Sequence, residues 1–505
     1  MPETRRRSPV PWPALVAAAS GALTSAACVA ASPTAASGGG PRILPAALGE
    51  PAPVNEAPAV TGGLAPGAGT VAVVGATVLV GDGRRIERGA VVFTDGRLVA
   101  VGPASEVEVP EGARRVEATA RFVTPGLIDT HSHLGVYAQP SVAPHADGNE
   151  MTDPTTPYVF SEHAFWPQDP AIDDAIAGGV TTIQVLPGSG NVIGGRSTVL
   201  KLRPRREARA MRFPGAPDGL KMACGENPKR VYGGKGRQPM SRMGSVYQLR
   251  AAFIDAREYA DARARYAAAH AAWEEELEAA KKSPSLKPPG PEPKPPPRDL
   301  GMETLAEALA GEILVHIHCY RADEMLLMLA LGDELGFRIA SFHHATEAYK
   351  IADVLAERSV GASVWADWWG FKLEAYDAVE ENAAMVAAAG GIPVIHSDSP
   401  IGIQRLNQEA AKALFAGRRL GLALSEDEAI RWVTQNPARV LGIDDRTGTL
   451  EVGKMADVVV WDRDPLSIYA RADLVFVDGV LVHDRSRPFE SASDFDVGAE
   501  VEVKR

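Results

Sequence analysis

At residues 124–133 the chain reads TPGLIDTHSH, a short apolar run that ends in two histidines, His131 and His133. On a β-strand, side chains two positions apart point to the same face, about 6–7 Å apart along the backbone. Two imidazoles placed in this way can bind one metal ion, with Zn–N bonds of about 2.0–2.1 Å. Taken alone, the motif fits a pair of exposed strand histidines equally well, so its meaning depends on the residues downstream.

The middle of the chain, residues 122–440, alternates short β-like apolar runs with helical stretches. The runs that we predict as strands are 127–131, 181–186, 199–202, 220–224, 313–318, 338–343, 360–365 and 392–396. Eight such runs, separated by helices or long loops, predict an α/β fold, a parallel (β/α)8 TIM-like barrel. The active-site face of such a barrel lies at the C-terminal ends of its strands.

Seven of the eleven histidines lie at or beside the C-terminal ends of four predicted strands, a bias that scattered core histidines would not show. They are His131, His133, His316, His318, His343, His344 and His396. Asp398 follows the eighth run, where a carboxylate can ligate a metal and also move protons. The sequence therefore predicts a metal-dependent site at this face.

Lys221 stands inside the predicted strand 220–224, which is an awkward place for an ammonium group. Burying a charge without a partner is costly. The side chain either points outward between barrel and helix, or it is chemically modified. Glu226, just beyond the same strand, offers a conventional carboxylate ligand.

Two β-rich flanks, residues 70–121 and 441–485, enclose the barrel and predict a small β-sandwich domain built from both. An insertion at 245–298 interrupts the barrel. Its first part, 245–282, is predicted as a long charged helix, and 283–298 is proline-dense and predicted to be extended. The insertion is interpreted as a solvated excursion, with a role as a lid or docking arm as the alternative.

The N-terminal residues 1–27 have a basic start, an apolar stretch and small residues at its end, which is typical of an export signal peptide. Cys28 follows two alanines and resembles a bacterial lipoprotein processing site. We therefore expect an exported protein, periplasmic or attached through Cys28 to the outer membrane or cell surface. Residues 28–69 are predicted to be a disordered linker and 486–505 a tail.

The composition limits the kinds of molecule that the protein is expected to bind. A net charge of −12 without a long basic run argues against nucleic acid, so we expect a small-molecule substrate, and assembly into a homo-oligomer is left open. Besides Cys28, the chain has only Cys224 and Cys319. Two cysteines do not make a disulfide framework, so both are predicted to be small buried residues with free thiols.

Several sequence blocks in order resemble the amidohydrolase superfamily, close to its imidazolonepropionase-like and Xaa-Pro dipeptidase-like branch. Besides residues 125–133, the blocks are VHIH at 315–318, HSDSP at 396–400, TQNPARVLG at 434–442 and GTLEVGKMAD at 448–457. The resemblance spans roughly residues 70–485.

The resemblance implies two divalent metal ions, with zinc expected. The implied ligands are His131, His133, His318, His344 and Asp398. A carboxylated Lys221 would bridge the two ions, as in related dipeptidases. Those relatives usually follow the lysine with two glycines, whereas this chain has Gly225-Glu226, so Glu226 stays open as the bridge. His343 is the alternative to His344, or it could polarise a substrate carbonyl.

The implied activity is hydrolysis of a C–N bond, in an amide or cyclic amide such as a dipeptide or N-acyl amino acid, by a metal-activated water. Asp398 would accept the proton of the water and pass it to the departing nitrogen. Candidate substrate contacts are Asn227, Lys229, Arg230, Tyr232, Tyr320 and Arg321. The alternatives are a mononuclear deaminase or imidazolone-type ring-opening hydrolase, and a non-catalytic exported binding protein.

Overall fold

The computed structural model describes residues 69–283 and 285–487. The predicted signal peptide, Cys28, and nearly all of the predicted linker and tail lie outside the described residues. Within the described ranges, none of the helices combines the length and the apolar character that a membrane crossing requires.

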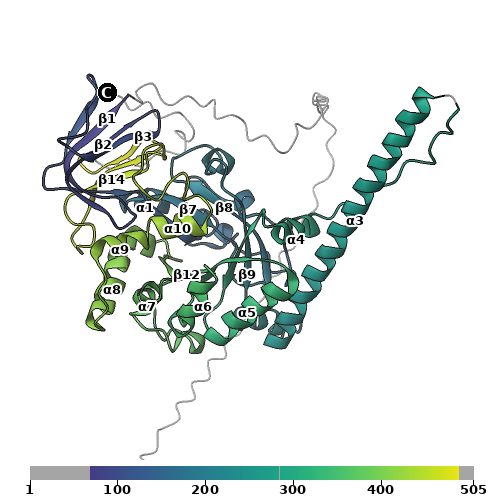
Figure 1. Ribbon diagram of the computed structural model, residues 1–505. Coiled ribbons are helices and arrows are strands. Elements are labelled where there is room, and N and C mark those ends of the chain that lie inside the picture. The colour runs from purple at the N-terminus through teal and green to yellow at the C-terminus, as the bar shows by residue number, and fades with distance from the viewer. Residues whose placement is uncertain (1–68, 284, 488–505) are drawn as a thin grey trace, which may run out of the picture. The chain divides into compact units, whose positions relative to one another are not determined.

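The central sheet has eight strands in the order β13-β12-β11-β10-β9-β8-β7-β6 (Figure 1). They are β6 (Leu127–Ser132), β7 (Val180–Val185), β8 (Ile193–Lys201), β9 (Gly219–Ala223), β10 (Leu314–His318), β11 (Ile339–His343), β12 (Gly361–Val364) and β13 (Ile392–Ile395). All eight predicted runs overlap these strands. The third run, predicted at 199–202, covers only the end of β8.

The prediction of an all-parallel barrel is wrong at β8, which runs antiparallel to both of its neighbours. The reason is the length of the connection. Only residues 186–192 separate β7 from β8. A parallel pair needs a crossover of about a dozen residues or more, whereas an antiparallel pair can be joined by a short turn.

The two end strands of the sheet, β6 and β13, do not pair in a ladder, so the barrel is nearly closed and is completed by other groups. At one end of the gap, Ile128 N donates to Val433 O at 2.9 Å and Ile395 N donates to Trp432 O at 3.0 Å. At the other end, Asp398 N donates to His131 O at 3.0 Å. Residues on both sides of the gap are therefore held together.

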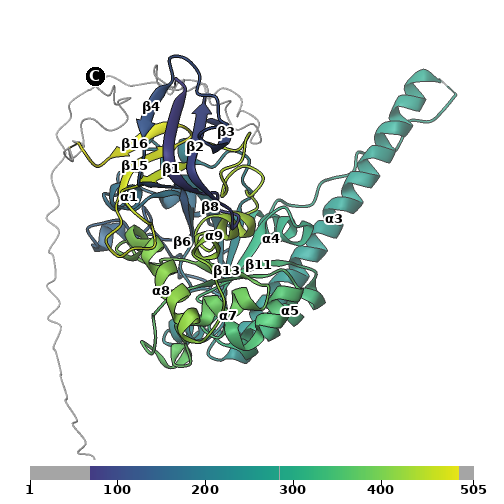
Figure 2. The same ribbon diagram turned by 60° about the vertical axis from the view of Figure 1, so that its left-hand side comes forward.

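Helices cover the outside of this sheet, and Figure 2 shows α5, α7 and α8 beside strands β11 and β13. The flanking helices are α1 (Ala171–Ala177), α4 (Leu300–Ala310), α5 (Ala322–Leu335), α6 (Ala352–Glu357), α7 (Asn382–Ala388), α8 (Leu406–Arg419), α9 (Glu426–Arg431) and α10 (Gln435–Val440). Their apolar faces and the strands form one large buried core. Helix α4 begins at Asp299, whose carboxylate accepts from Gly301 N and Met302 N and so caps the helix.

The insertion contains the long helix α3 (Arg242–Lys282), and the short helix α2 (Glu226–Gly233) precedes it. The predicted helix at 245–282 is confirmed, and the described residues 283 and 285–298 form neither helix nor strand. Buried side chains of α3 stop at Ala256. Farther out, the segment after α3 returns along it, and Trp273 Nε1 donates to Gly290 O at 2.8 Å (Figure 1). The outer part of the insertion therefore rests on its own contacts.

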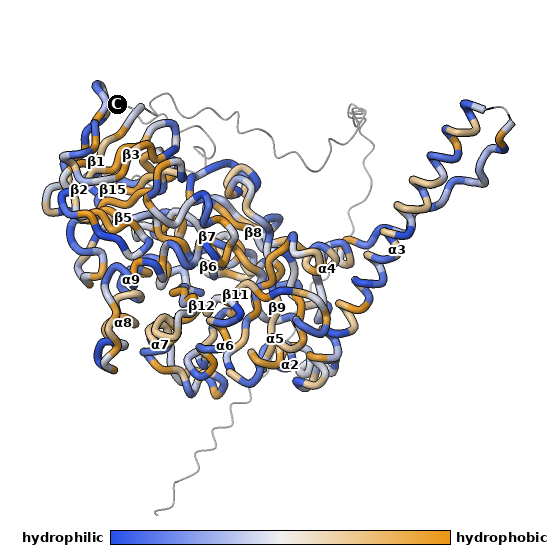
Figure 3. Tube along the Cα trace, viewed as in Figure 1, coloured by the Kyte–Doolittle hydropathy of each residue, from blue (hydrophilic) through white to orange (hydrophobic). Residues whose placement is uncertain are grey.

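The second sheet draws strands from both ends of the described chain. They are β1 (Val71–Leu79), β2 (Arg85–Thr94), β3 (Arg97–Pro103), β4 (Arg114–Glu117), β5 (Phe122–Pro125), β14 (Val458–Trp461), β15 (Ala472–Val477) and β16 (Val480–Asp484). Strand β5 pairs antiparallel with β14 and so joins the two flanks. Phe93 and Phe476 lie on strands that do not pair, yet their ring centroids are 5.1 Å apart. The sheet therefore curves around a core of its own, and Figure 3 shows hydrophobic stretches along its strands.

The second sheet contacts the barrel through a buried aromatic ring and a buried charge. Gly179, with φ of +86°, precedes β7, and a Cβ there would lie 2.9 Å from the ring of Trp461. Lys201, the last residue of β8, places its ammonium 2.9 Å from Asp457 and also contacts Asp478. Both contacts need the two sheets to be in place, so they fix the base of the barrel.

The prediction of free thiols is wrong, because Cys224 and Cys319 form a disulfide. Both are buried, as expected. The pairing could not be predicted from the sequence, because the two cysteines are 95 residues apart and meet only when β9 and β10 lie side by side.

We expect Lys201→Met to lower the free energy of unfolding by about 3–5 kcal/mol, because it leaves the buried carboxylate of Asp457 and the partly buried one of Asp478 without their lysine. Urea unfolding followed by circular dichroism measures the loss. Lys412→Met is the matched control, since its exposed ion pairs are worth about 1 kcal/mol or less. Equal effects of the two substitutions would contradict the prediction.

Candidate metal centre and active site

Histidines from several strands converge at the C-terminal ends of the barrel strands. His131, His318, His343, His344 and His396 are each at most 2% exposed. Burial is the main cause that lowers the pKa of each of these imidazoles, so they are neutral at physiological pH. A neutral imidazole is the form of histidine that binds metals.

One group of ligand atoms lies around Asp398. Its Oδ1 is 3.3 Å from Nε2 of His133 and 3.8 Å from Nε2 of His131, and the three residues can offer ligand atoms within 4.8 Å of one another. Nδ1 of His133 is 3.0 Å from Leu186 O, which directs Nε2 toward Asp398. Such a partner on the other ring nitrogen is typical of metal-binding histidines.

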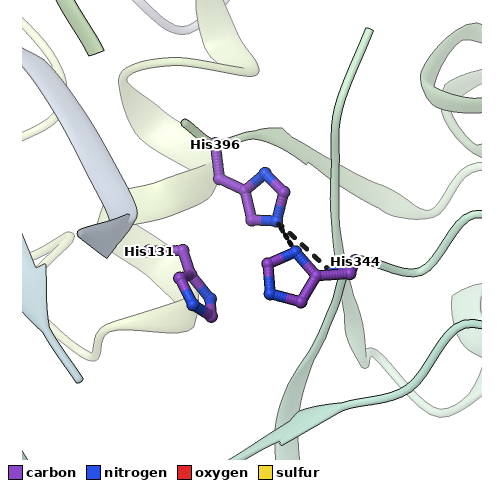
Figure 4. A group of neighbouring side chains, drawn as sticks. All are labelled: His131, His344 and His396. Atoms are coloured by element: carbon purple, nitrogen blue, oxygen red, sulfur yellow. Dashed lines mark hydrogen bonds between the residues drawn. The ribbon is translucent and has the colours of Figure 1, made fainter. Parts of the chain in front are cut away.

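A second group contains His131, His344 and His396, whose rings face one another in Figure 4. Nδ1 of His344 lies 2.9 Å from Nε2 of His396. Nε2 of His344 is therefore left to face Asp398, 3.8 Å from Oδ2. The two groups share His131, and Asp398 approaches both.

His318 has a buried ring nitrogen that is available to a metal ion. Among the described residues, its Nδ1 has no hydrogen-bond partner, and its Nε2 lies 3.3 Å from Nδ2 of Asn227, so the tautomer decides which nitrogen carries the ring proton. Its ring lies 4.8 Å from that of His344. Leaving a buried polar atom unpaired costs about 1–3 kcal/mol. A metal ion beside His344 would satisfy this atom, so the donor set fits the expected cofactor.

Two of the expected ligands adopt left-handed backbone conformations, with φ of +57° at His344 and +50° at Asp398. Such a conformation in a non-glycine residue costs about 1–3 kcal/mol and is concentrated at functional sites. On a regular strand, His343 and His344 would point to opposite faces. The turn at His344 lets both rings approach His131, with centroids 4.9 and 4.3 Å away.

Lys221 points into the centre and not outward between barrel and helix. Its Nζ lies 3.5 Å from Nε2 of His131 and donates to Pro187 O at 3.1 Å. No carboxylate of the described chain pairs with it within 4 Å. Burial lowers the pKa of Lys221 to about 7, so a large share of this amine is uncharged at neutral pH.

Glu226 lies apart from the imidazoles. It is the first residue of α2, and its Oε1 is 3.6 Å from Nζ of Lys372. Glu374 accepts from Glu226 N at 3.0 Å, an approach that Gly225 permits, because a Cβ there would lie 2.9 Å from the Glu374 carboxylate. Of the two residues expected as a bridge, Lys221 is therefore the one among the histidines.

The expected contact of His343 with a substrate carbonyl is not supported. Nδ1 of His343 lies 2.8 Å from Nδ1 of His131, and its Nε2 lies 3.0 Å from Nδ1 of His316. Both ring nitrogens are thus engaged, and the side chain is fully buried. His343 instead orients His131, so that Nε2 of His131 faces Lys221 and Asp398.

Asp129, which the sequence interpretation missed, connects the two sides of the barrel gap. Its Oδ1 accepts from His131 N at 3.0 Å and from Ser397 N at 3.2 Å, and its Oδ2 accepts from the Ser397 hydroxyl. Burial raises the pKa of Asp129 to about 7, while these hydrogen bonds act in the opposite direction. The carboxylate thereby sets the distance between His131 and Asp398.

Known proteins share this architecture. The crystal structure of an amidohydrolase from Thermotoga maritima MSB8 superposes with a TM-score of 0.70, at 34% identity over 82% of this chain and 100% of that one. The chain belongs to the amidohydrolase superfamily. The amidohydrolase family model also matches residues 372–483.

Two further relatives show which amidohydrolases this chain is similar to. The amidohydrolase tasK of Hapsidospora irregularis is 34% identical over 415 residues, which are 79% of this chain, and this chain spans only 39% of that protein. The imidazolonepropionase of Acidiphilium cryptum is 25% identical over 75% of this chain and 88% of its own length. Membership supports a hydrolase acting on C–N bonds, and the imidazolonepropionase-like assignment agrees with the second relative.

Only some of the residues that were expected to contact the substrate lie near the histidine cluster. Asn227 reaches His318, and the Tyr320 ring lies 4.7 Å from that of His318. Tyr232 is instead buried, and its hydroxyl donates to Asp153 O. Arg321 pairs with Asp323 at the surface. Lys229 and Arg230 lie on α2, where Arg230 is exposed.

The loop after β12 supplies a cation, Lys372, which the sequence interpretation missed, and an aromatic wall. Nζ of Lys372 lies 4.3 Å above the Tyr320 ring and donates to Asn227 Oδ1 at 3.2 Å. Trp365 stacks on His344 with centroids 4.3 Å apart, and Trp368 stacks on Trp365 at 4.8 Å. A cavity of about 300 Å³ beside Trp365 and Trp368 holds none of the clustered histidines.

We expect Asp129→Asn to reduce the metal content of the purified protein and to lower its unfolding free energy by about 2–4 kcal/mol. An amide in place of the carboxylate cannot satisfy all three donors, and buried donors left unpaired are costly. Ser397→Ala removes one donor only and should cost about 1–2 kcal/mol. Elemental analysis and urea unfolding measure both effects, and an Asp129→Asn variant with unchanged metal content would contradict this role.

Proposed function

We propose that this amidohydrolase hydrolyses the C–N bond of an amide or cyclic amide with the help of bound divalent metal. The observation that carries the proposal is the convergence of His131, His133 and Asp398, whose ligand atoms lie within 4.8 Å of one another. Imidazoles together with a carboxylate suit zinc, which we propose as the metal.

His131, His133 and Asp398 would hold one ion, and His318 and His344 a second. Bound divalent metal lowers the pKa of water toward about 7 and polarises the carbonyl that is attacked. Asp398 is positioned to move the proton. It accepts the proton of the attacking water on a carboxylate oxygen and delivers it to the nitrogen that departs.

Lys221 is proposed as the bridge between the two ions, in carboxylated form. Its uncharged amine adds to carbon dioxide and loses a proton, giving a carbamate whose oxygens can bind metal. Burial favours this reaction because it lowers the pKa of Lys221 to about 7. The modification also removes the cost of an unpaired buried ammonium beside His131.

A dipeptide or an N-acyl amino acid is proposed as the substrate. Lys372 is partly exposed and stands over Tyr320, beside Asn227 and thus near His318. An ammonium in this place can bind the carboxylate of such a substrate. Trp365 and Trp368 would pack against its apolar part.

A mononuclear ring-opening hydrolase or deaminase is the second candidate. The similarity to imidazolonepropionase, over 88% of that protein, favours it. In that case Lys221 carries no carboxylate and one metal ion suffices.

Export, periplasmic or to the cell surface, is proposed as well. The buried Cys224–Cys319 disulfide supports it, because structural disulfides persist mainly in oxidising compartments.

We expect about two metal ions per chain in wild-type protein prepared with zinc and bicarbonate, together with hydrolysis of amides in a dipeptide and N-acyl amino acid panel. Lys221→Ala should fall to about one ion and lose activity by at least about 100-fold, because the bridging oxygens are gone. Glu226→Gln is the control and should keep both ions. One ion per wild-type chain would support the mononuclear candidate. A wild-type protein without bound metal would contradict the proposed metal-dependent hydrolase.

We expect Lys372→Met to raise KM for substrates with a free carboxylate by about 10–100-fold, with little change in kcat, since one charge-assisted hydrogen bond is worth about 1.5–3 kcal/mol. Steady-state kinetics on each acid and its matching primary amide measures the preference. KM for the matching amide should change little. Lys350→Met is the control, because Lys350 pairs with Glu347 and Asp377 away from the histidines. An equal rise of KM for acids and amides would argue against carboxylate binding.

A further inference from the structure

We propose that the Cys224–Cys319 disulfide is a clasp that holds two metal ligands, Lys221 and His318, at the distance that the centre requires. The inference rests on the proposed function, because it assumes that these residues bind metal. The cysteines touch neither metal nor substrate in this proposal, so they are positioning residues.

The clasp closes the two strands at the point where the ligands leave them. Cys319 directly follows His318, and Cys224 comes three residues after Lys221. In the β9–β10 ladder, Lys221 lies opposite His316 and Ala223 lies opposite His318. The disulfide is therefore the next link after the last pair of this ladder.

Hydrogen bonds continue the ladder only briefly beyond the strand ends. Cys224 N donates to His318 O at 2.9 Å, and Cys319 N donates to His343 O at 3.0 Å. The backbone N–H of each cysteine thus links its strand end to the neighbouring strand, and His318 lies between these two hydrogen bonds. Element ends open locally at low free-energy cost when only hydrogen bonds hold them. A covalent link between β9 and β10 removes this freedom.

The position of the clasp matches the longest connection in the barrel. Between β9 and β10 the chain leaves for α2, α3 and α4, a separation of 95 residues between the cysteines. When a long segment connects two neighbouring strands, that segment does little to keep the strand ends together, because closing a long loop costs more conformational entropy than closing a short one. The excursion leaves β9 directly after Cys224 and returns to the start of β10 at Leu314, so a displacement that enters through the end of β9 meets the disulfide before it reaches Lys221.

Burial makes the clasp a fixed part of the centre. Cys224 and Cys319 are 1% and 0% exposed and belong to the main hydrophobic core. Metal sites need their ligands held within about 0.5 Å of the productive geometry. A permanent link at this point serves that need, whereas a buried bond is poorly placed to respond to reductants in solution.

The test compares how fast the cobalt-loaded protein loses its metal to an excess of chelator, followed by the visible absorption of Co²⁺. Two full-length variants remove the bond. Cys224→Ala with Cys319→Ala leaves a cavity, whereas Cys224→Ala with Cys319→Val restores most of the lost volume. Val315→Ala, a buried change on β10 with the disulfide intact, is the matched control for lower stability. Thermal unfolding of each metal-free protein is recorded in parallel.

We expect both cysteine variants to release cobalt about 10-fold faster than wild type, which is at the low end of the effect of removing groups that orient metal ligands. Val315→Ala should release it at the wild-type rate in spite of a lower unfolding temperature. Wild-type release from the Ala/Val variant would overturn the clasp alone, as would equally fast release from Val315→Ala. A wild-type protein that binds no cobalt would overturn the proposed centre and the clasp with it.

Discussion

The buried carboxylate of Asp129 is the constraint on which the site depends, because the barrel sheet does not close by strand pairing. Strands β6 and β13 end the sheet without a ladder between them. Asp129 accepts from groups on both sides of the gap, His131 N and the backbone and hydroxyl of Ser397. The neighbouring bond from Asp398 N to His131 O continues this connection. One small hydrogen-bonded unit thus closes the gap at the end where the site lies and fixes the spacing of two expected metal ligands.

The remaining geometry follows from burying many imidazoles in one place. Desolvation disfavours their charged forms, so the cluster consists of neutral rings that can act as hydrogen-bond acceptors and metal ligands. Several rings are oriented by a partner at the other nitrogen. His133 uses Leu186 O, His344 uses His396, and His131 uses His343. The nitrogens that are left face Asp398 or Lys221, so the orientation of each ligand is decided by a residue that need not bind metal itself.

The insertion contributes to the site through its base. Arg242, at the start of α3, pairs with Glu324 on α5 and with Glu374 in the loop after β12. Glu374 in turn accepts from Glu226 N. The chain that carries Lys372 is therefore held from two sides. Arg257 and Tyr259 of α3 still reach Leu335 and Glu303, and the part of α3 beyond them makes no comparable contact with the barrel in the described residues.

The sequence by itself determined seven of the eight strand positions and the end of β8. It also determined the clustering of histidines at strand ends and the membership of the superfamily, because these depend on local patterns of apolar residues and short motifs. Tertiary structure alone decided how these residues meet. The reversed direction of β8, the Cys224–Cys319 bond and the engagement of His343 by two other rings all depend on distances between segments far apart in the chain. Lys221 shows the division most clearly. Its awkward place in a strand was visible in the sequence, but only the packed barrel decided that the amine points at His131, because neither its burial nor its neighbours exist before the strands come together.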